Sequence, residues 1–330
     1  MLHSDTGKPA RFQSDPVARE GHGPTAISLG HRRPGLEFRG AMAPRVPSIA
    51  PGLRNVATRS ASAALCDTSR MIPVLISVVS YLVASGLLVA GIRRERRAPA
   101  WLFAACIGML AHALEHSLVW RSLGGADMHF FAAISLVTLG MAVLTTVVGA
   151  RGRMATLGVL VYPIAAAALL GSHLHGHRPP EPLDWRLQLH AWLALLAYAT
   201  LAVAALLAVM LWLQERALSR REVHGWLRAL PPLVELETLL FRTIATGFVL
   251  LSATLLTGLL FVEDLLAQHL VHKTVLSLVS WLVFGVLLLG RWRQGWRGRT
   301  AVHWTLAAMV LLVLAFFGSK FVLELGLGRA

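Results

Sequence analysis

Long apolar runs alternate with short polar gaps between residues 71 and 323. Each run has about the 20 residues that a helix needs to cross a hydrocarbon core of ~30 Å. A transmembrane β-strand would be shorter and would alternate in polarity, which these runs do not do. Because lipid offers no hydrogen bonds, each continuous run must satisfy its own backbone groups as a helix. The pattern predicts an all-α, polytopic integral membrane protein with about eight transmembrane helices. The runs lie near residues 71–92, 99–120, 129–148, 154–171, 188–212, 242–262, 272–290 and 302–323.

Arginine residues gather in every second gap between these runs. Lys and Arg close to helix ends are retained on the cytoplasmic side of the membrane. We therefore expect a multi-pass protein of the bacterial inner (plasma) membrane with odd-numbered loops in the cytoplasm and both ends of the helical region in the periplasm. The basic clusters are Arg93, Arg94, Arg96 and Arg97 in the first gap, Arg151 and Arg153 in the third, Arg216, Arg220, Arg221 and Arg228 in the fifth, and Arg291, Arg293, Arg297 and Arg299 in the seventh.

Residues 1–70 differ in character from the rest of the chain. They hold ten Lys or Arg against five acids, are rich in Pro, Gly and Ser, and lack the apolar core of a signal peptide. A segment this basic should not cross readily to the periplasm, and Met71 directly precedes the first apolar run. We expect residues 1–70 to be a disordered tail or a misassigned start, and residues 71–330 to be the eight-helix domain.

Composition excludes several classes of function. The chain has two cysteines and no CxxC or CxxCH motif, which argues against a thiol-redox protein or a c-type cytochrome. It has no Gly-rich phosphate loop of the kind that binds ATP. The inward-facing loops and the tail account for most of the net charge of +14, so no nucleic-acid partner is needed to explain it. We find no catalytic constellation and expect a protein that is not an enzyme.

Histidine is the informative residue, because it costs free energy in lipid and yet recurs toward the outer helix ends. His112 and His116 are four residues apart and share a helix face, with Glu115 able to bond to one imidazole. His190 and His272 each stand at the start of a later helix. Neutral imidazoles are axial ligands of haem iron, so facing histidines from separate helices can hold a haem.

Each histidine also has a plainer interpretation. A histidine at a helix mouth can be a cap or an interface residue, and His112 and His116 can serve packing or hydrogen bonding. His173, His175 and His177, in the sequence HLHGHRPP, can recruit a metal ion, although a short His-rich stretch is only a compositional signal.

Four stretches resemble the haem-handling cytochrome c assembly family, which includes CcsA-type, CcmC-type and HemX-type proteins. The likeness covers residues 71–323 and is strongest from residue 189. The stretches are LHAWLALLAYATLAVAALLAVMLWLQE from Leu189, LPPLVELETLLFRTIATGFVLLSATLLTG from Leu230, HKTVLSLVSWLVFGVLLLGRWRQGWRGR from His272, and AFFGSKFVL near the end.

The resemblance implies a protein that binds or hands on haem at the outer face of the membrane. The tryptophan-rich haem loop of CcsA-type proteins is replaced here by FVEDLLAQHLVHKT, which favours the HemX-type or the short CcsA-like branch over a working synthetase. His190 matches the family's outward histidine, His272 stands where the lost loop would supply a ligand, and His112 looks like the family's histidine in an early helix. The expected cofactor is non-covalent haem b with His190 and His272 as iron ligands, and the expected partners are other cytochrome c assembly proteins or a haem-synthesis enzyme.

Two cations near the outer boundary, Arg186 and Lys273, can pair with haem propionates. Two other functions remain open. One is a permease for a small solute or metal ion, and the other is a HemX-like regulatory partner that docks a soluble enzyme on the fifth gap. The permease hypothesis rests on polar residues at membrane depth, namely Glu115, Ser252, Thr254, Thr257 and Ser277.

Overall fold

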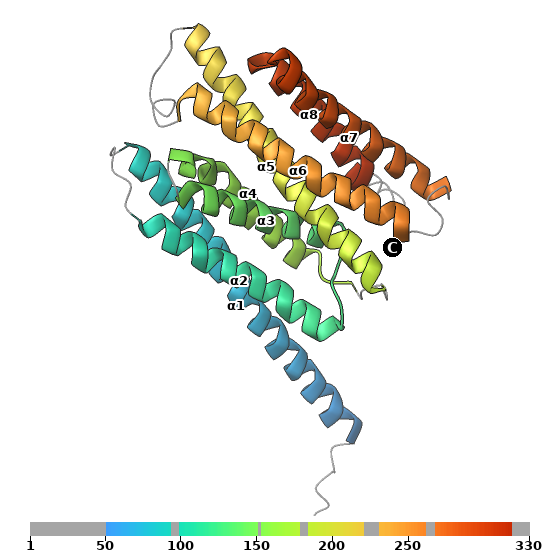
Figure 1. The fold of residues 1–330 in the computed structure, drawn as a ribbon. Helices are drawn as coiled ribbons and strands as arrows, with labels where there is room; N and C mark the ends of the chain where they lie inside the picture. The colour runs from blue at the N-terminus through green and yellow to red at the C-terminus, as the bar shows by residue number, and fades with distance from the viewer. Residues whose placement is uncertain are drawn as a thin grey trace, which may run out of the picture. The chain divides into compact units, whose positions relative to one another are not determined.

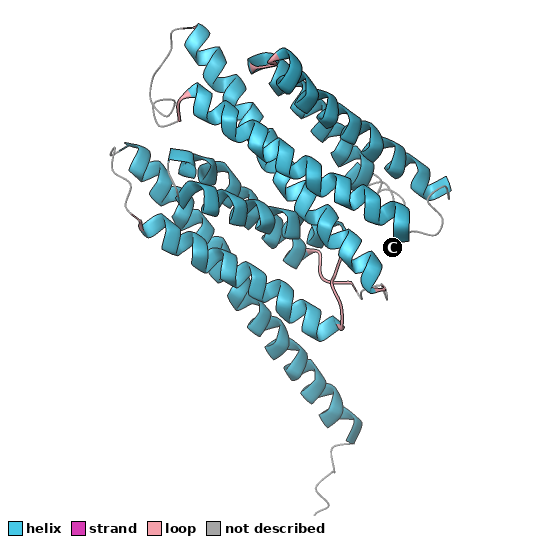
Figure 2. Ribbon diagram, viewed as in Figure 1, coloured by secondary structure: helices cyan, strands magenta, loops and turns pink. Residues whose placement is uncertain are grey.

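The computed structural model describes residues 51–93, 99–150, 153–178, 184–220, 231–261 and 268–318. Within these ranges the chain forms helices joined by turns and contains no strand, which confirms the all-α prediction (Figure 2). The chain divides into two compact units, Met1–Leu53 and Arg54–Ala330. The second unit contains the described helices, apart from residues 51–53. Of the fifth gap, which we predicted as a docking surface, residues 221–230 lie outside the described residues.

Eight helices of the described chain are long and apolar enough to cross a membrane, as the hydropathy pattern predicts. They run back and forth, so that successive connections lie at opposite ends (Figure 1). A 3-10 turn, η1 (Arg153–Leu157), precedes α4, and a π-helical turn, η3 (Leu314–Gly318), continues α8. The helices are α1 (Pro51–Arg93), α2 (Ala100–Leu123), α3 (Phe130–Ala150), α4 (Gly158–Leu174), α5 (Trp185–Ser219), α6 (Leu233–Phe261), α7 (Gln268–Gln294) and α8 (Gly298–Val313).

Helix α1 starts well before the first apolar run. It begins at Pro51, a residue suited to the first position of a helix because its missing N–H is not needed there. No proline or glycine interrupts the chain between Leu53 and Ile72, and the helix continues through Pro73, although this residue cannot donate a backbone hydrogen bond to the carbonyl of residue 69. The boundary expected at residues 70 and 71 therefore lies inside a continuous helix.

Helix α5 lies at the centre and contacts α3, α6 and α8. Small side chains allow this close approach: a Cβ on Gly140 of α3 would lie 2.8 Å from Cβ of Ala199, and one on Gly247 of α6 would lie 2.5 Å from Leu201 Cδ2. Close packing of small residues drives helix association in lipid, where the hydrophobic effect gives no attraction between helices. These contacts fix the positions of α5 and α6, on which one candidate site is built.

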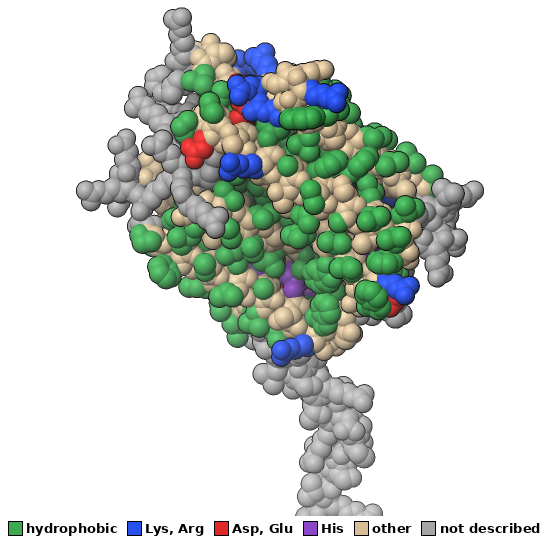
Figure 3. All heavy atoms as spheres, in the orientation of Figure 1, with side chains coloured by type: hydrophobic (Ala, Val, Ile, Leu, Met, Phe, Trp, Pro, Cys, Tyr) green, Lys and Arg blue, Asp and Glu red, His purple; other side chains and the backbone are tan. Residues whose placement is uncertain are grey.

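The outer surface is apolar. Phe103, Leu110, Val249 and Leu259 are each at least 66% exposed, as suits side chains that face lipid tails. Figure 3 shows hydrophobic side chains across most of one face and Lys and Arg side chains near its edges. We call the end where α2, α4 and α6 finish the histidine end, and the opposite end, where α5 and α7 finish, the arginine end.

Candidate functional site

A cavity of about 820 Å³ lies between α5, α6, α7 and the α8–η3 segment. Its walls are mainly Leu, Ala and aromatic side chains. A small number of polar groups in a largely apolar pocket of a few hundred cubic ångströms is typical of sites for small molecules and cofactors. The side chains with polar groups that line it are His190, Tyr198, Ser252, Thr254, Lys273, Thr274, Ser277 and Trp281.

His190 lies near the start of α5, at the histidine end of the cavity. Helix α5 begins where it does because Asp184 Oδ1 accepts the Trp185 backbone N–H at 2.8 Å and caps the helix. His190 Nδ1 lies 3.2 Å from Thr257 Oγ1 on α6, which fixes the ring by a hydrogen bond. Gly258 makes room for the ring, because a Cβ there would lie 3.1 Å from His190 Cε1. The imidazole is thus held in one orientation at the cavity wall.

Lys273, in the first turns of α7, lines the same cavity as His190. The structure therefore brings together two residues 83 positions apart in the chain that we singled out from the sequence. An ammonium group in a largely apolar pocket attracts a carboxylate strongly, because little water screens it.

Most of the cavity's other polar side chains are satisfied by the protein. Thr254 Oγ1 donates to the Leu250 carbonyl at 2.9 Å, and Ser252 Oγ accepts the Trp281 indole N–H at 2.7 Å. Trp281 also stacks on Phe248, with ring centroids 5.4 Å apart. Ser252 and Thr254, which supported the permease hypothesis, thus have hydrogen-bond partners within the protein.

Two other predicted haem-site residues, His272 and Arg186, differ from His190 and Lys273. His272 stands beside Lys273 in α7, but its side chain is outside the part of the chain that the structure describes. Arg186 does not line the cavity; its side chain is 57% exposed, lies 3.9 Å from Asp184, and covers the rings of Trp185 and Phe261.

His112 and His116 belong to a separate group between α1, α2 and α3. His112 is 0% exposed, and both its ring nitrogens have partners: Tyr81 Oη lies 3.3 Å from Nδ1, and Ser135 Oγ lies 2.8 Å from Nε2. His116 Nε2 shares the same serine oxygen at 3.0 Å. We expected these histidines with His190 on the outer side; the structure places them near that end but outside the α5–α8 cavity.

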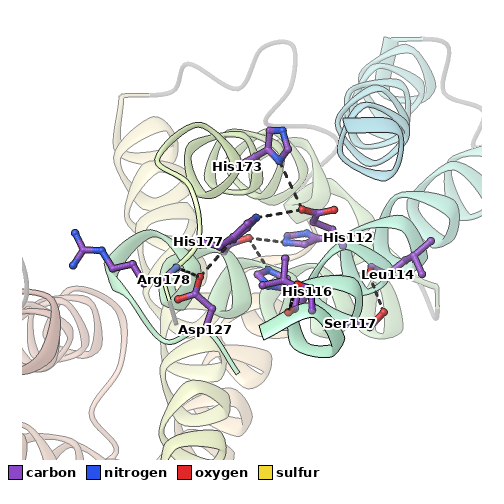
Figure 4. Close-up of polar contacts among 12 residues, drawn as sticks. His112, Leu114, His116, Ser117, Asp127, His173, His177 and Arg178 are labelled. Carbon is purple, nitrogen blue, oxygen red and sulfur yellow. Dashed lines mark hydrogen bonds and ion pairs between the residues drawn. The ribbon is translucent and has the colours of Figure 1, made fainter. Parts of the chain in front are cut away.

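A third group lies beside them at the histidine end: Glu115, His173, His177 and Asp127. Glu115 was expected to meet an imidazole of its own helix, yet its Oε1 lies 3.7 Å from His173 Nδ1 and 3.6 Å from His177 Nε2. In Figure 4, dashed lines from His173 and His177 converge on one carboxylate, and Asp127 lies beyond His177. Asp127 and His129 were missed from the sequence, although the run Asp-Met-His shortly after α2 was a visible signal.

The charges in this group affect one another. The carboxylate of Asp127, and then that of Glu115, raises the pKa of His177 to about 9 despite its partial burial. Burial alone would raise the pKa of Asp127, but the hydrogen bonds from His129 and the nearby imidazole of His177 outweigh it and hold that pKa well below its usual range. Asp127 is therefore a carboxylate in the folded protein.

A family model described as "Cytochrome C assembly protein" matches residues 98–326. The inner membrane protein YpjD of Escherichia coli (strain K12) is 33% identical over 264 residues, which cover 76% of this chain and 97% of that protein. Protein HemX of Brevibacillus brevis is 26% identical over 131 residues, covering 39% of this chain and 48% of HemX. The cytochrome c biogenesis protein CcsA of Prochlorococcus marinus (strain MIT 9515) is 30% identical over 96 residues, covering 28% of this chain and 30% of CcsA. No solved structure matches the chain. With eight apolar helices and a family match over most of its length, this multi-pass membrane protein belongs to the cytochrome c assembly family.

Proposed function

We propose that this protein binds haem non-covalently, as haem b, in the α5–α8 cavity, with His190 as an axial iron ligand. The observation that carries the proposal is an apolar cavity of about 820 Å³ that contains both an oriented imidazole and a lysine. Its volume falls within the range of about 300–1,000 Å³ that is usual for ligand sites.

The residues that line the α5–α8 cavity are chemically suited to haem. A histidine that ligates metal through one nitrogen is usually held through the other, and the Thr257 hydrogen bond to Nδ1 leaves Nε2 as the coordinating atom. The leucine and aromatic walls suit an apolar macrocycle, and Lys273 can pair with a propionate. Haem, when bound, supplies an iron with axial positions for imidazole. The protein's own part is to hold and release it.

The second axial ligand in this proposal is His272, the residue before Lys273 on α7. Arg186, exposed near the same end, is proposed as a second propionate partner. We assign haem to the cavity rather than to His112 and His116, because both ring nitrogens of His112 already have hydrogen-bond partners.

We further propose that the protein lies in the bacterial inner membrane with the histidine end toward the periplasm. A cytoplasmic position of the opposite end is supported by Arg216 and Arg220 at the end of α5 and by Arg291 and Arg293 in the last turn of α7. The name of the YpjD relative supports this location, and the name of the CcsA relative supports a role beside other cytochrome c assembly proteins. A haem-synthesis enzyme is proposed as the alternative partner, as the resemblance to HemX-type proteins implies.

The test is haem titration of the purified full chain, followed by its absorption spectrum. We expect about one haem per chain and a Soret band that changes on replacing His190 with Ala, because an axial ligand is lost. His303→Ala is the matched control, since His303 is an exposed histidine near the start of α8, at the arginine end. Absence of haem binding by the unaltered protein, or equal spectra for the His190 variant and the unaltered protein, contradicts the proposal.

A further inference from the structure

Glu115 is the most unusual buried group in the described chain. It is 2% exposed, and neither of its carboxylate oxygens has a hydrogen-bond partner. Burying a carboxylate without a compensating partner costs several kcal/mol, so such groups in folded proteins are normally paired or bound to metal. Its environment should therefore contain the missing partner.

The side chains that face Glu115 are two imidazoles from the end of α4 and the turn after it. His173 Nδ1 lies 3.7 Å and His177 Nε2 lies 3.6 Å from Glu115 Oε1. Both distances are too long for good hydrogen bonds. His173 Nδ1 is also buried without a hydrogen-bond partner among the described residues.

These separations match the spacing of ligands around a metal ion. Ligand atoms bound to one tetrahedral Zn²⁺ at about 2.0–2.2 Å are roughly 3.3–3.6 Å apart. The three ligand atoms of Glu115, His173 and His177 all lie within 4.8 Å of one another. Closing the shell requires the side chains to move by roughly 1 Å.

We propose that Glu115, His173 and His177 form a binding site for a divalent transition-metal ion of the Zn²⁺ type at the histidine end. One carboxylate oxygen and two imidazole nitrogens are ligands that such ions prefer, and three protein ligands leave one coordination position open. The ion would tie the segment after α4 to α2 and would neutralise the buried carboxylate. The site is distinct from the α5–α8 cavity, and the proposal does not depend on haem binding.

Asp127 is the positioning residue of this site. Its Oδ2 lies 3.4 Å from His177 Nδ1, on the side of the ring away from Glu115, so a carboxylate stands behind a metal-ligating imidazole. Such carboxylate–histidine pairs orient the ligand and fix its tautomer. Asp127 is itself held by the backbone N–H of His129 at 3.1 Å and of Arg178 at 3.2 Å, and its Oδ1 lies 2.6 Å from His129 Nδ1.

The experiment is titration of the haem-free, chelator-treated full chain with Zn²⁺ in detergent, using protein purified without a histidine tag. We expect one Zn²⁺ per chain by calorimetry and elemental analysis. Glu115→Gln and His173→Asn should each weaken binding at least about a hundredfold, and Asp127→Asn about ten- to hundredfold.

His175→Asn is the matched control. His175 lies between the two ligating histidines in sequence, but it is exposed, stacks on Phe131 and bonds to the Gly171 carbonyl. The His175→Asn variant should bind Zn²⁺ with the same affinity as the unaltered protein. Thermal unfolding of each metal-free variant in detergent checks that it is folded, and His190→Ala should keep its Zn²⁺ site. No Zn²⁺ binding by the unaltered chain, or equal affinity in Glu115→Gln, overturns the proposal and leaves only an ion pair between Glu115 and the histidines.

Discussion

A buried glutamate lies toward each end of the described helix bundle, and the two have different surroundings. At the arginine end, Glu237 is 7% exposed, and its Oε1 accepts a hydrogen bond from Arg291 at 2.5 Å and lies 3.4 Å from Arg297. At the histidine end, Glu115 is 2% exposed, has no hydrogen bond, and faces imidazoles at 3.6 and 3.7 Å.

The difference separates a structural ion pair from a ligand set. The Glu237 pair is complete within the protein, because a guanidinium supplies the charge and the hydrogen bond together. It also closes the turn into α8, since Arg291 donates to the Trp296 carbonyl at 3.1 Å. Glu115 and its histidines stand too far apart for direct hydrogen bonds, so in our proposal this end is completed by a cation from outside the chain.

Breaking the ion pair between Glu237 and Arg291 should have the largest effect on stability. Arg291→Ala leaves Glu237 buried beside only the exposed Arg297, and we expect a loss of about 3 kcal/mol of stability, the low end for buried pairs because the Arg291 side chain is 25% exposed. Thermal unfolding in detergent measures it. Arg293→Ala, an exposed arginine of the same helix turn, is the control and should change little. Equal melting of the two variants would contradict the assignment.

The group of Glu115, His173 and His177 should instead make the stability of the protein depend on bound Zn²⁺. Zn²⁺ at a hundred times its Kd should stabilise the unaltered chain by about 2.7 kcal/mol, because only the folded state holds the site. Glu115→Gln should lose this gain, because an amide is a poor substitute for a carboxylate ligand, and it should change the metal-free stability less than Arg291→Ala does, since the imidazoles stand too far from Glu115 for direct hydrogen bonds. Unfolding with and without Zn²⁺ measures both. A Glu115→Gln variant that is unstable without metal would show that Glu115 is already paired.

The turn at the arginine end should be intolerant of added volume. A Cβ on Gly290 would lie 2.5 Å from the Trp296 indole, so Gly290→Ala should cost about 2 kcal/mol through displacement of that ring. Gly86→Ala, in α1 with nothing within 4 Å of the added atom, is the control and should be neutral or mildly stabilising. Thermal melts that fail to separate the two variants would place Trp296 elsewhere.

The smallest effect should come from the turn that precedes Asp127. Gly124 ends α2 at φ 76°, and its N–H donates to the Trp120 carbonyl at 2.9 Å. An alanine in this left-handed conformation should cost about 1 kcal/mol by chain strain alone, since the space around the residue is open. The same unfolding assay measures it; a loss as large as that of Gly290→Ala would reveal a contact absent from this structure.

The sequence predicted the fold well for a simple reason. Lipid imposes one requirement on every span, namely about 20 apolar residues in a self-satisfied helix, and the hydropathy pattern shows it directly. The hydropathy pattern did not predict where each helix ends, because contacts with water and with neighbouring side chains determine the helix ends. Helix α5 extends over Trp185–Ser219, beyond the apolar run expected at 188–212, because Asp184 caps it at one end and its last turns continue outside the apolar core.

The candidate sites were predicted only as a set of residues. Hydropathy and residue type identified His112, His190, Lys273 and the His-rich segment as unusual at their depth. They could not sort these residues into groups, because the distance between two helices in lipid depends on small-residue contacts such as Gly247 against Leu201.

By itself, the sequence determined that the chain is a bundle of eight apolar helices with arginines at one end and histidines at the other. The tertiary structure alone decided that His190 shares a cavity with Lys273, that His112 is occupied by Tyr81 and Ser135, and that Glu115 faces His173 and His177. The physical reason is that solvent preference is a property of each segment, whereas coordination depends on side chains from distant segments meeting within a few ångströms.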